Sequence, residues 1–342
     1  MSILVTGGCG FIGSNFIRKW LNEYDEKVIN LDNLTYAGSS SNLLSHQLNS
    51  NYSFIKGNIG DSSLVTTLLN KFKPRAIINF AAESHVDRSI ETPDIFIENN
   101  VLSSFKLIEC AKIYWQTRSQ RHQSEFRFIN ISTDEVFGSL SSEAPAFTEN
   151  HCYQPNSPYS ASKASFDHIV RSYYHTYGFP AITCNCSNNY GPYQHKEKLI
   201  PKIILNALSH KPIPIYGDGQ QIRDWLYVAD HCDALCTVLK KGSVGETYNI
   251  GGSNEETNLA IAHKICDIFT QLRPLKKSPL LKKITRYHDL ITHVEDRAGH
   301  DTRYAIDAGK ISTQLGWFAQ ESLCSGLAKT ISWYLDNSKK LL

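Results

Sequence analysis

The feature that most constrains the fold is a glycine-rich loop between a short apolar strand and an amphipathic helix. The segment Thr6-Gly-Gly-Cys-Gly-Phe-Ile-Gly13 follows a predicted strand over 3–5 and opens a predicted helix over 11–24. Glycines allow the backbone to turn tightly and to approach a pyrophosphate, whose charge is met by the helix N-terminus. In this context the loop indicates a dinucleotide-binding unit that includes Gly7, Gly10 and Gly13.

An acidic residue at the end of the next predicted strand, over 27–31, specifies the dinucleotide. Asp32 stands 19 residues beyond Gly13, where a carboxylate can accept hydrogen bonds from the ribose hydroxyls of an adenosine. Asn33 follows it, and no arginine is present there to neutralise a 2′-phosphate. The sequence therefore favours NAD over NADP.

Strand-like and helix-like segments alternate through the first half of the chain. Strands are predicted over 52–56, 76–80, 127–131 and 181–185, and helices over 62–72, 95–115 and 158–177. Short apolar strands that alternate with helices predict an α/β fold, a Rossmann-type doubly wound parallel sheet covered on both faces. After Tyr190 the pattern loosens, which predicts a smaller C-terminal substrate-binding domain. We expect a first domain over 1–190 with a returning segment near 223–250, and a second over 191–222 and 251–342.

Composition excludes several classes of function. The net charge of +2 gives no reason to expect nucleic acid or a membrane surface as a partner. The first residues, Met1-Ser-Ile-Leu-Val-Thr6, contain no basic stretch and lead straight into the glycine loop, so we expect no signal peptide. The nine cysteines are scattered without zinc-ligand spacing, so we expect no metal and a reducing cytoplasm.

Five residues form the candidate catalytic group. Tyr159 and Lys163 stand four apart on a predicted helix and share one face, where the ammonium can favour the phenolate. Thr133, Asp134 and Glu135 closely follow the strand over 127–131, at the sheet edge where open α/β folds bind ligands. The Tyr–Lys pair suits oxidation of an alcohol. Two carboxyl groups beside it indicate a second reaction, the elimination of water next to the new ketone.

Several longer strings carry a resemblance to a known family. They are Ala81-Ala-Glu-Ser-His-Val-Asp-Arg-Ser89, Ser132-Thr-Asp-Glu-Val136, Pro158-Tyr-Ser-Ala-Ser-Lys163, Asn188-Asn-Tyr-Gly-Pro192, Glu197-Lys-Leu-Ile-Pro201, Arg223-Asp-Trp225 and Arg297-Ala-Gly-His-Asp301. With these strings, nearly the whole chain resembles the extended short-chain dehydrogenase/reductase family. Within that family it is similar to the 4,6-dehydratases that act on dTDP-glucose.

The resemblance implies a three-step reaction and a role for each catalytic residue. Tyr159 takes the proton of the sugar C4 hydroxyl while the C4 hydride moves to NAD, and Thr133 orients the oxygen. Glu135 then removes the C5 proton and protonated Asp134 donates to the leaving C6 hydroxyl. Return of the hydride to C6 and of a proton to C5 gives a 4-keto-6-deoxy sugar, dTDP-4-keto-6-deoxyglucose.

The resemblance also implies binding residues and an assembly. The cofactor residues are Gly7, Gly10, Phe11, Ile12, Gly13, Asp32, Asn58, Ile59, Ala81, Ala82, Asn99, Tyr159 and Lys163. The residues for the nucleotide-sugar substrate are Ser84, His85, Asn188, Glu197, Lys198, Leu199, Pro214, Tyr216, Arg223, Asn258, Arg297 and His300. A homodimer through helices near 95–115 and 158–177 is expected.

Three alternatives remain open from the sequence. One is a 4,6-dehydratase acting on a GDP-, CDP- or UDP-linked sugar, and another is a 4-epimerase, which the paired acids disfavour. The third is a non-catalytic NAD-sensing or scaffold protein, which the complete set of Thr133, Tyr159 and Lys163 disfavours. Two positions also depart from the family pattern, since Asn58 replaces an acid near the adenine and Phe137 replaces a tyrosine.

Overall fold

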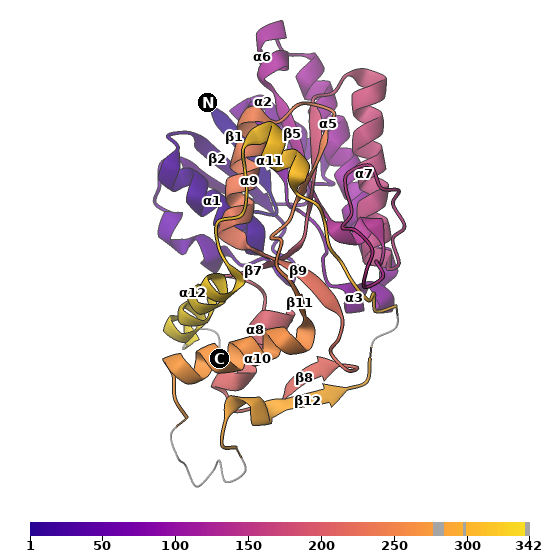
Figure 1. Cartoon of the computed structure of the whole chain (residues 1–342). Helices are drawn as coiled ribbons and strands as arrows, with labels where there is room; N and C mark the ends of the chain where they lie inside the picture. Colours follow the sequence, from indigo (N-terminus) through magenta and orange to yellow (C-terminus); the bar gives the residue numbers. More distant parts are fainter. Residues whose placement is uncertain (276–283, 297–298, 339–342) are drawn as a thin grey trace.

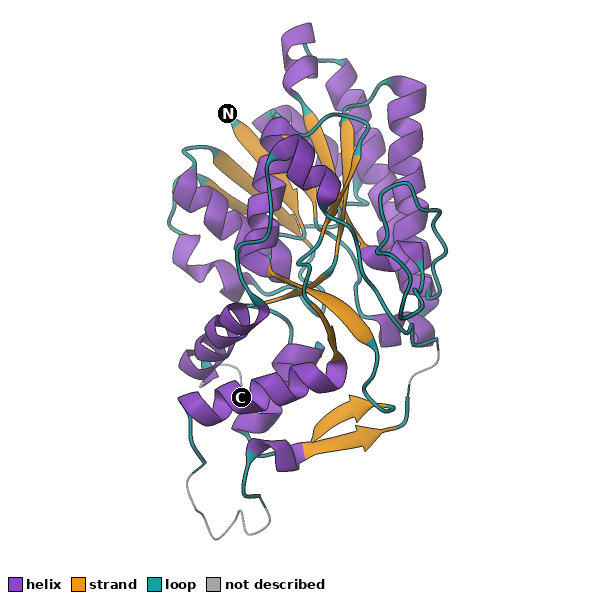
Figure 2. Ribbon diagram, viewed as in Figure 1, coloured by secondary structure: helices purple, strands orange, loops and turns teal. Residues whose placement is uncertain are grey.

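The chain forms a larger lobe built around one sheet and a smaller lobe of helices and short strands (Figure 1). The computed structural model describes residues 1–275, 284–296 and 299–338. Figure 2 shows the strands of the larger lobe fanned between helices, with the smaller lobe packed against one end of the sheet.

The central sheet confirms the predicted fold class. Its strands are β1 (Ser2–Thr6), β2 (Lys27–Asp32), β3 (Tyr52–Lys56), β4 (Ala76–Asn79), β5 (Arg127–Thr133), β6 (Ala181–Cys186) and β10 (Thr247–Ile250). They lie in the order β10-β6-β5-β4-β1-β2-β3, and every neighbouring pair is parallel. The chain changes direction along the sheet between β1 and β4, which is the place where doubly wound folds bind ligands.

Helices cover both faces of this sheet, as a buried parallel sheet requires. They are α1 (Phe11–Glu23), α2 (Ser62–Phe72), α5 (Ser104–Gln116), α7 (Pro158–Tyr177), α9 (Val228–Lys241) and α11 (Gly309–Leu315). One core cluster contains Phe16 of α1 and Leu235 of α9, and another contains Leu68 of α2, Ile108 of α5 and Phe166 of α7. The alternation of strand-like and helix-like segments in the sequence therefore reflects the burial of apolar side chains on both faces of the sheet.

Two elements near the site differ from the prediction. The helix predicted over 95–115 is interrupted, because α4 (Pro93–Phe96) is followed by a π-helix, η2 (Ile97–Ser103), before α5 begins. Strand β5 runs on to Thr133, so Thr133 ends the strand rather than following it. The short helices η1 (Ser40–His46), α3 (Val86–Glu91), α6 (Gln120–Glu125) and η3 (Asp134–Phe137) were not expected from the periodicity.

The smaller lobe has its own core. Its strands β7 (Asn188–Tyr190), β9 (Ile222–Tyr227) and β11 (Glu255–Thr257) form one sheet, and β8 (Ile213–Tyr216) pairs with β12 (Ile291–Val294). Helices α8 (Leu199–Leu208), α10 (Asn258–Leu272), η5 (Tyr287–Leu290) and α12 (Leu323–Asp336) pack around Ile204, Phe269 and Ile331. Before it reaches α12, the chain contributes Ile311 and Trp317 to the core of the larger lobe. The division into domains by residue range stays a prediction.

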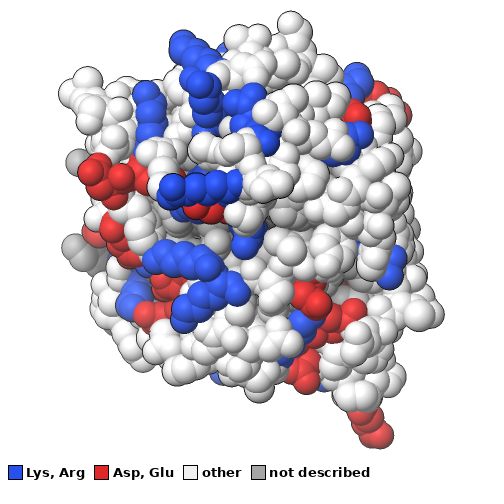
Figure 3. All heavy atoms as spheres, turned by 90° about the horizontal axis from the view of Figure 1, so that it is seen from above, with Lys and Arg blue, Asp and Glu red and all other residues white. Residues whose placement is uncertain are grey.

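The surface mixes charges of both signs. On the face seen in Figure 3, lysine and arginine side chains lie beside aspartate and glutamate side chains. Over residues 1–275, 284–296 and 299–338, no helix has the length and apolar character needed to span a bilayer. Those same ranges contain no group of three His, Cys, Asp or Glu side chains arranged to hold a metal ion.

Candidate active site

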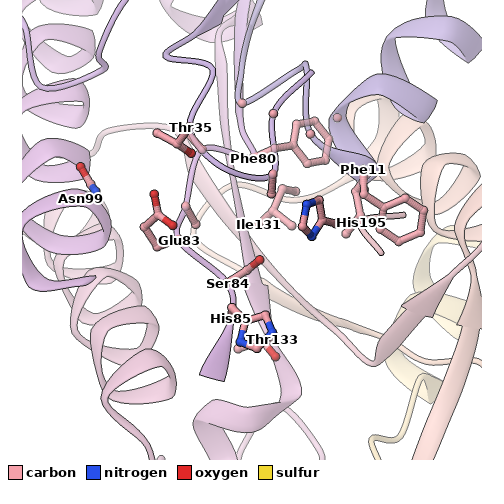
Figure 4. Close-up of a pocket in the computed structure, with 18 of the residues that line it drawn as sticks. Phe11, Thr35, Phe80, Glu83, Ser84, His85, Asn99, Ile131, Thr133 and His195 are labelled. Atoms are coloured by element: carbon pink, nitrogen blue, oxygen red, sulfur yellow. The ribbon is translucent and has the colours of Figure 1, made fainter. Parts of the chain in front are cut away.

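A pocket of about 290 Å³ lies along the carboxyl ends of the central strands. Its wall combines the glycine loop after β1, the segments after β2, β4 and β5, the start of α7 and the loop that leads into α8. Figure 4 shows that side chains from these separate segments, among them Phe11, Asn99 and Thr133, surround one space. The topology thus brings together motifs that lie as far apart in the sequence as Gly7 and Lys198.

The glycine loop has no room for side chains. Gly7 has a φ of +67°, and a Cβ there would lie 2.6 Å from the backbone nitrogen of Ala81. A Cβ on Gly13 would lie 2.5 Å from the carbonyl oxygen of Gly7. Helix α1 begins directly after this loop, at Phe11, so its unpaired N–H groups lie at the pocket wall. This cradle fits a pyrophosphate.

Asp32 ends β2 at the same pocket, as predicted. Its carboxylate accepts hydrogen bonds from the backbone N–H of Cys9, at 2.8 Å, and of Leu34, at 2.7 Å. Burial raises the pKa of Asp32, and the two hydrogen bonds counteract that effect. The acid is therefore held rigidly beside the glycine loop, where a ribose can reach it.

Every residue predicted to bind the cofactor lines this pocket: Gly7, Gly10, Phe11, Ile12, Gly13, Asp32, Asn58, Ile59, Ala81, Ala82, Asn99, Tyr159 and Lys163. Asn99 lies in the π-helix, and its neighbour Asn100 donates to the carbonyl of Glu83 at 2.9 Å and to Ser162 at 2.9 Å. The π-helix is thereby tied to both the β4 loop and α7. The residues that line this pocket therefore fit a bound dinucleotide.

The paired acids stand where β5 passes into η3. Asp134 is 1% exposed, and its Oδ1 accepts a hydrogen bond from the Thr133 hydroxyl at 3.1 Å. Within the described ranges its Oδ2 is buried without a hydrogen-bond partner. Burial raises the pKa of Asp134 well above its usual value, and the nearby carboxylates of Glu135 and Asp224 raise it further. Burial and the neighbouring carboxylates therefore favour the neutral form of Asp134.

Tyr159 and Lys163 enter the pocket from the first turns of α7. The helix begins with a capping box in which Ser157 and Ser160 bond reciprocally, and Gly178 ends it. Burial raises the pKa of Tyr159 well above its usual value, Glu135 adds to this, and a hydrogen bond with Thr133 opposes it. Lys163 Nζ donates to the carbonyl of Ile131 at 2.6 Å. A phenolate here needs a nearby positive charge.

The predicted substrate residues fall into two groups. Ser84, His85, Asn188 and Lys198 line the pocket, and Lys198 Nζ donates to the Ser84 carbonyl at 2.7 Å. The others are outside its wall: Glu197, Leu199, Pro214, Tyr216, Arg223, Asn258 and His300. Arg297 lies outside the described residues.

The second group still adjoins the first. Glu197 pairs with Arg88 at 2.7 Å and lies 3.6 Å from His85. The Tyr216 hydroxyl donates to Asp87 at 3.3 Å, which connects β8 to α3. Helix α3 follows the strand end that carries Ser84, so these contacts join the smaller lobe to the pocket wall.

Arg223 has a different environment from the one expected of a surface ligand. It is 5% exposed, donates to the Asp301 carbonyl at 3.0 Å and lies 4.3 Å above the Tyr304 ring. Its charge lowers the pKa of Asp134, in opposition to burial. Arg223 therefore acts electrostatically on the Asp134 carboxyl group. Whether it also contacts a diphosphate stays a prediction.

Sequence reasoning missed several pocket residues. Thr35, Tyr36, Glu83, Asn189, Gln194 and His195 also line the pocket. Glu83 is 7% exposed, and burial raises its pKa. A usable signal was available for Glu83 and Thr35, because both follow predicted strands at the ligand-binding edge. The remaining positions depend on how the long loops fold back.

The fold and the site together define an NAD-binding member of the extended short-chain dehydrogenase/reductase class with an added pair of acids. The chain belongs to the nucleotide-sugar 4,6-dehydratases, since the family model described as GDP-mannose 4,6 dehydratase matches residues 4–330.

The three similar proteins described next are all named dTDP-glucose 4,6-dehydratase. The chain is 51% identical over 334 residues to the dTDP-glucose 4,6-dehydratase of Xanthomonas campestris pv. campestris (strain B100), an alignment that covers 98% of this chain and 93% of the relative. The solved dTDP-glucose 4,6-dehydratase of Bacillus anthracis in complex with NAD is 43% identical, with a TM-score of 0.86 and coverage of 99% and 98%. That of Streptomyces venezuelae, also with NAD bound, is 40% identical, with a TM-score of 0.88 and the same coverage.

Proposed function

We propose that this protein catalyses the NAD-dependent dehydration of dTDP-glucose to dTDP-4-keto-6-deoxyglucose. The observation that carries the proposal is that Asp134 and Glu135 line the same pocket as Tyr159, where burial and the neighbouring carboxylates favour the neutral form of Asp134. Opposite protonation states in adjacent carboxyl groups are what an elimination requires. The relatives at about half identity are named for this reaction, and the pocket fits NAD.

The first step needs a base at the C4 hydroxyl. Tyr159 takes that proton, while Thr133, which bonds Asp134 and lowers the pKa of Tyr159, orients the same oxygen. Lys163 supplies positive charge from the next helical turn. NAD supplies hydride acceptance at C4 and hydride return at C6.

The elimination follows from the C4 ketone, which acidifies the C5 proton. Glu135, only partly buried, removes that proton as the base. Asp134 donates its proton to the departing C6 hydroxyl, so that water leaves. The proton held by Glu135 returns to C5 when the hydride returns to C6. The proton that Tyr159 gained from the C4 hydroxyl then replaces the one lost by Asp134, so each turnover leaves the net charge of the site unchanged.

The smaller lobe binds the nucleotide in this proposal. The proposed substrate unit consists of 191–222 and 251–342. Arg297 and His300 of this unit, together with Arg223 at its boundary, are the groups proposed to face the diphosphate, and Lys198 is among the residues that line the rest of the substrate site. Support comes from the contacts of Glu197 and Tyr216 with α3, which place the smaller lobe against the pocket wall.

Incubation with a panel of glucose nucleotides tests the proposal directly. We expect dTDP-glucose to give the alkaline absorbance of a 4-keto sugar at a higher kcat/KM than UDP-, GDP- or CDP-glucose. A different preferred base would identify a dehydratase for another nucleotide sugar. Formation of the C4 epimer without a keto product would instead identify an epimerase.

We also propose a homodimer. Large apolar side chains are exposed along α4, the π-helix and α5, namely Ile95, Ile97, Leu102, Phe105 and Ile113, and Tyr177 of α7 is exposed as well. We infer that these side chains form an apolar stripe, and exposed apolar surface of this kind is typical of a protein–protein interface. A location in the cytoplasm is proposed from the nine cysteines, all of which are free thiols.

A further inference from the structure

Helix α7 carries a third ionisable residue in line with the two catalytic ones. Asp167 follows Lys163 by four residues, the same spacing at which Lys163 follows Tyr159. Side chains at this spacing lie along one face of a helix. Asp167 is 4% exposed, and a buried carboxylate is costly unless it is paired and hydrogen-bonded. The reaction described above gives it no role.

Three consecutive residues of β5 hold Asp167 and Lys163. Asn130 Nδ2 donates to Asp167 Oδ1 at 2.7 Å, and the Ser132 hydroxyl donates to Asp167 Oδ2 at 2.5 Å. The carbonyl of Ile131, between them, accepts from Lys163 Nζ at 2.6 Å. The strand therefore fixes the carboxylate and the ammonium relative to each other.

The charges in this region favour an ionised pair. Burial lowers the pKa of Lys163, and Asp167 raises it again. Burial raises the pKa of Asp167 to about 6, with the charge of Lys163 as the main opposing effect, so its carboxylate is ionised at neutral pH. The other titratable groups against this pair are Cys184, Cys186 and Tyr153. Burial raises the pKa of each of them, that of Cys186 to about 12, and they stay neutral.

The pair also lies between two cavities. Lys163 lines the active-site pocket, whereas Asp167 lines a second cavity of about 230 Å³ together with Tyr153 and His168. Asp167 therefore borders a different cavity from the active-site pocket, whose wall includes Lys163 but not Asp167.

We propose that Asp167 is a positioning residue for the reaction, because its carboxylate keeps the buried ammonium of Lys163 charged and thereby supports the phenolate of Tyr159. Asp167 touches neither substrate nor cofactor. This inference rests on the proposed function, in which Tyr159 acts as the base.

The Asp167→Asn variant tests the inference through pH dependence. Reduction of bound NAD by the sugar nucleotide is followed by its absorbance, and the rate rises with pH as the phenolate forms. Without the carboxylate the ammonium is less populated, so the phenolate forms only at higher pH. We expect the low-pH part of this rate profile, its acid limb, to shift to higher pH by at least about one pH unit.

A second readout needs no substrate. The phenolate absorbance of the NAD-loaded protein is titrated, with the Tyr159→Phe variant as the blank for the other tyrosines. The midpoint of the Tyr159 signal should rise in Asp167→Asn. If wild-type protein forms neither reduced cofactor nor a 4-keto product from dTDP-glucose, the proposed function fails, whereas the substrate-free titration still decides the role of Asp167.

Asp230→Asn is the matched control. Asp230 is also a buried helical aspartate, 4% exposed, and it accepts from the backbone of Gln320 and Glu321 away from Lys163. This variant should lower stability without moving the acid limb.

Ser132→Ala replaces Asp167→Asn as the test if Asp167→Asn does not fold. Loss of the hydrogen bond from the Ser132 hydroxyl raises the pKa of Asp167, and so moves the acid limb in the same direction by a smaller amount. An acid limb that stays in place in both Asp167→Asn and Ser132→Ala, or in Ser132→Ala alone when the other variant is unfolded, would overturn the proposal.

Discussion

Asp134 and Glu135, the two acids proposed for the elimination, differ in environment although they are adjacent in the chain. Glu135 is partly exposed and Asp134 is fully enclosed, which separates a base from an acid within one short turn. For Glu135→Gln we expect bound NAD still to be reduced by the sugar nucleotide, since Tyr159 is intact. Release of the 4-keto-6-deoxy product should fall by about 100-fold or more.

Absorbance of the reduced cofactor and a keto-sugar assay on the same sample separate these two steps. Glu143→Gln, at an exposed position, is the control and should leave both signals unchanged. Normal product release by Glu135→Gln would contradict its role as the C5 base.

Asp134 also connects activity with stability. Its pKa is raised in the folded state, so its stabilising contribution is present in acid and is lost as pH rises above the unfolded value toward the folded value. Asn cannot ionise, so Asp134→Asn should lose dehydration and yet gain stability relative to wild type as pH rises. The gain is up to about 1.4 kcal/mol per pH unit in that window. Thermal unfolding at pH 5 and pH 8 measures it, and a difference between the proteins that does not change with pH would contradict the assignment.

At the scale of elements, a comparison of Gly7 with Gly178 separates the energetic cost of backbone strain from that of steric crowding. Gly7 and Gly178 have nearly the same φ, +67° and +64°, but a Cβ at Gly178 would meet no atom within 4 Å. Gly178→Ala should therefore cost only about 1–2 kcal/mol of backbone strain. Gly7→Ala should cost more and also lose NAD binding, because the new methyl group collides with the segment after β4. Denaturant unfolding and calorimetric titration with NAD test both variants, and retained NAD affinity in Gly7→Ala would exclude the cradle.

Regular elements were predictable from sequence where burial and local signals agree. Helix α2 and helix α7 have the predicted bounds, since Asp61 and Ser157 cap them and apolar periodicity runs through each. The π-helix was not predictable, because its cause is tertiary: Asn100 bonds the β4 loop and α7 at once. Asp167 could have been noticed from its four-residue spacing after Lys163, but the strand side chains that hold it are distant in sequence. The pocket residues in long loops carried no such pattern.

At the scale of the whole molecule, the apolar stripe along α4, the π-helix and α5 predicts the assembly. Phe105 is 41% exposed in the middle of that stripe. Phe105→Glu should convert the proposed dimer to a monomer, because a buried unpaired charge at an interface is strongly unfavourable. Light scattering measures the mass. Phe318→Glu, at a phenylalanine 62% exposed and far from the stripe in sequence, is the control and should keep the wild-type mass. A wild-type protein that is monomeric at all concentrations would contradict the dimer.

The distribution of the thiols has a practical consequence. Cys152 and Cys324 are exposed, and the other seven cysteines are buried. Cys152 borders the second cavity in the larger lobe, and Cys324 lies in α12 of the smaller lobe. Maleimide dyes would thus attach once to each lobe of the unmodified protein, and resonance energy transfer between them would follow any closure of the lobes around an incoming sugar nucleotide.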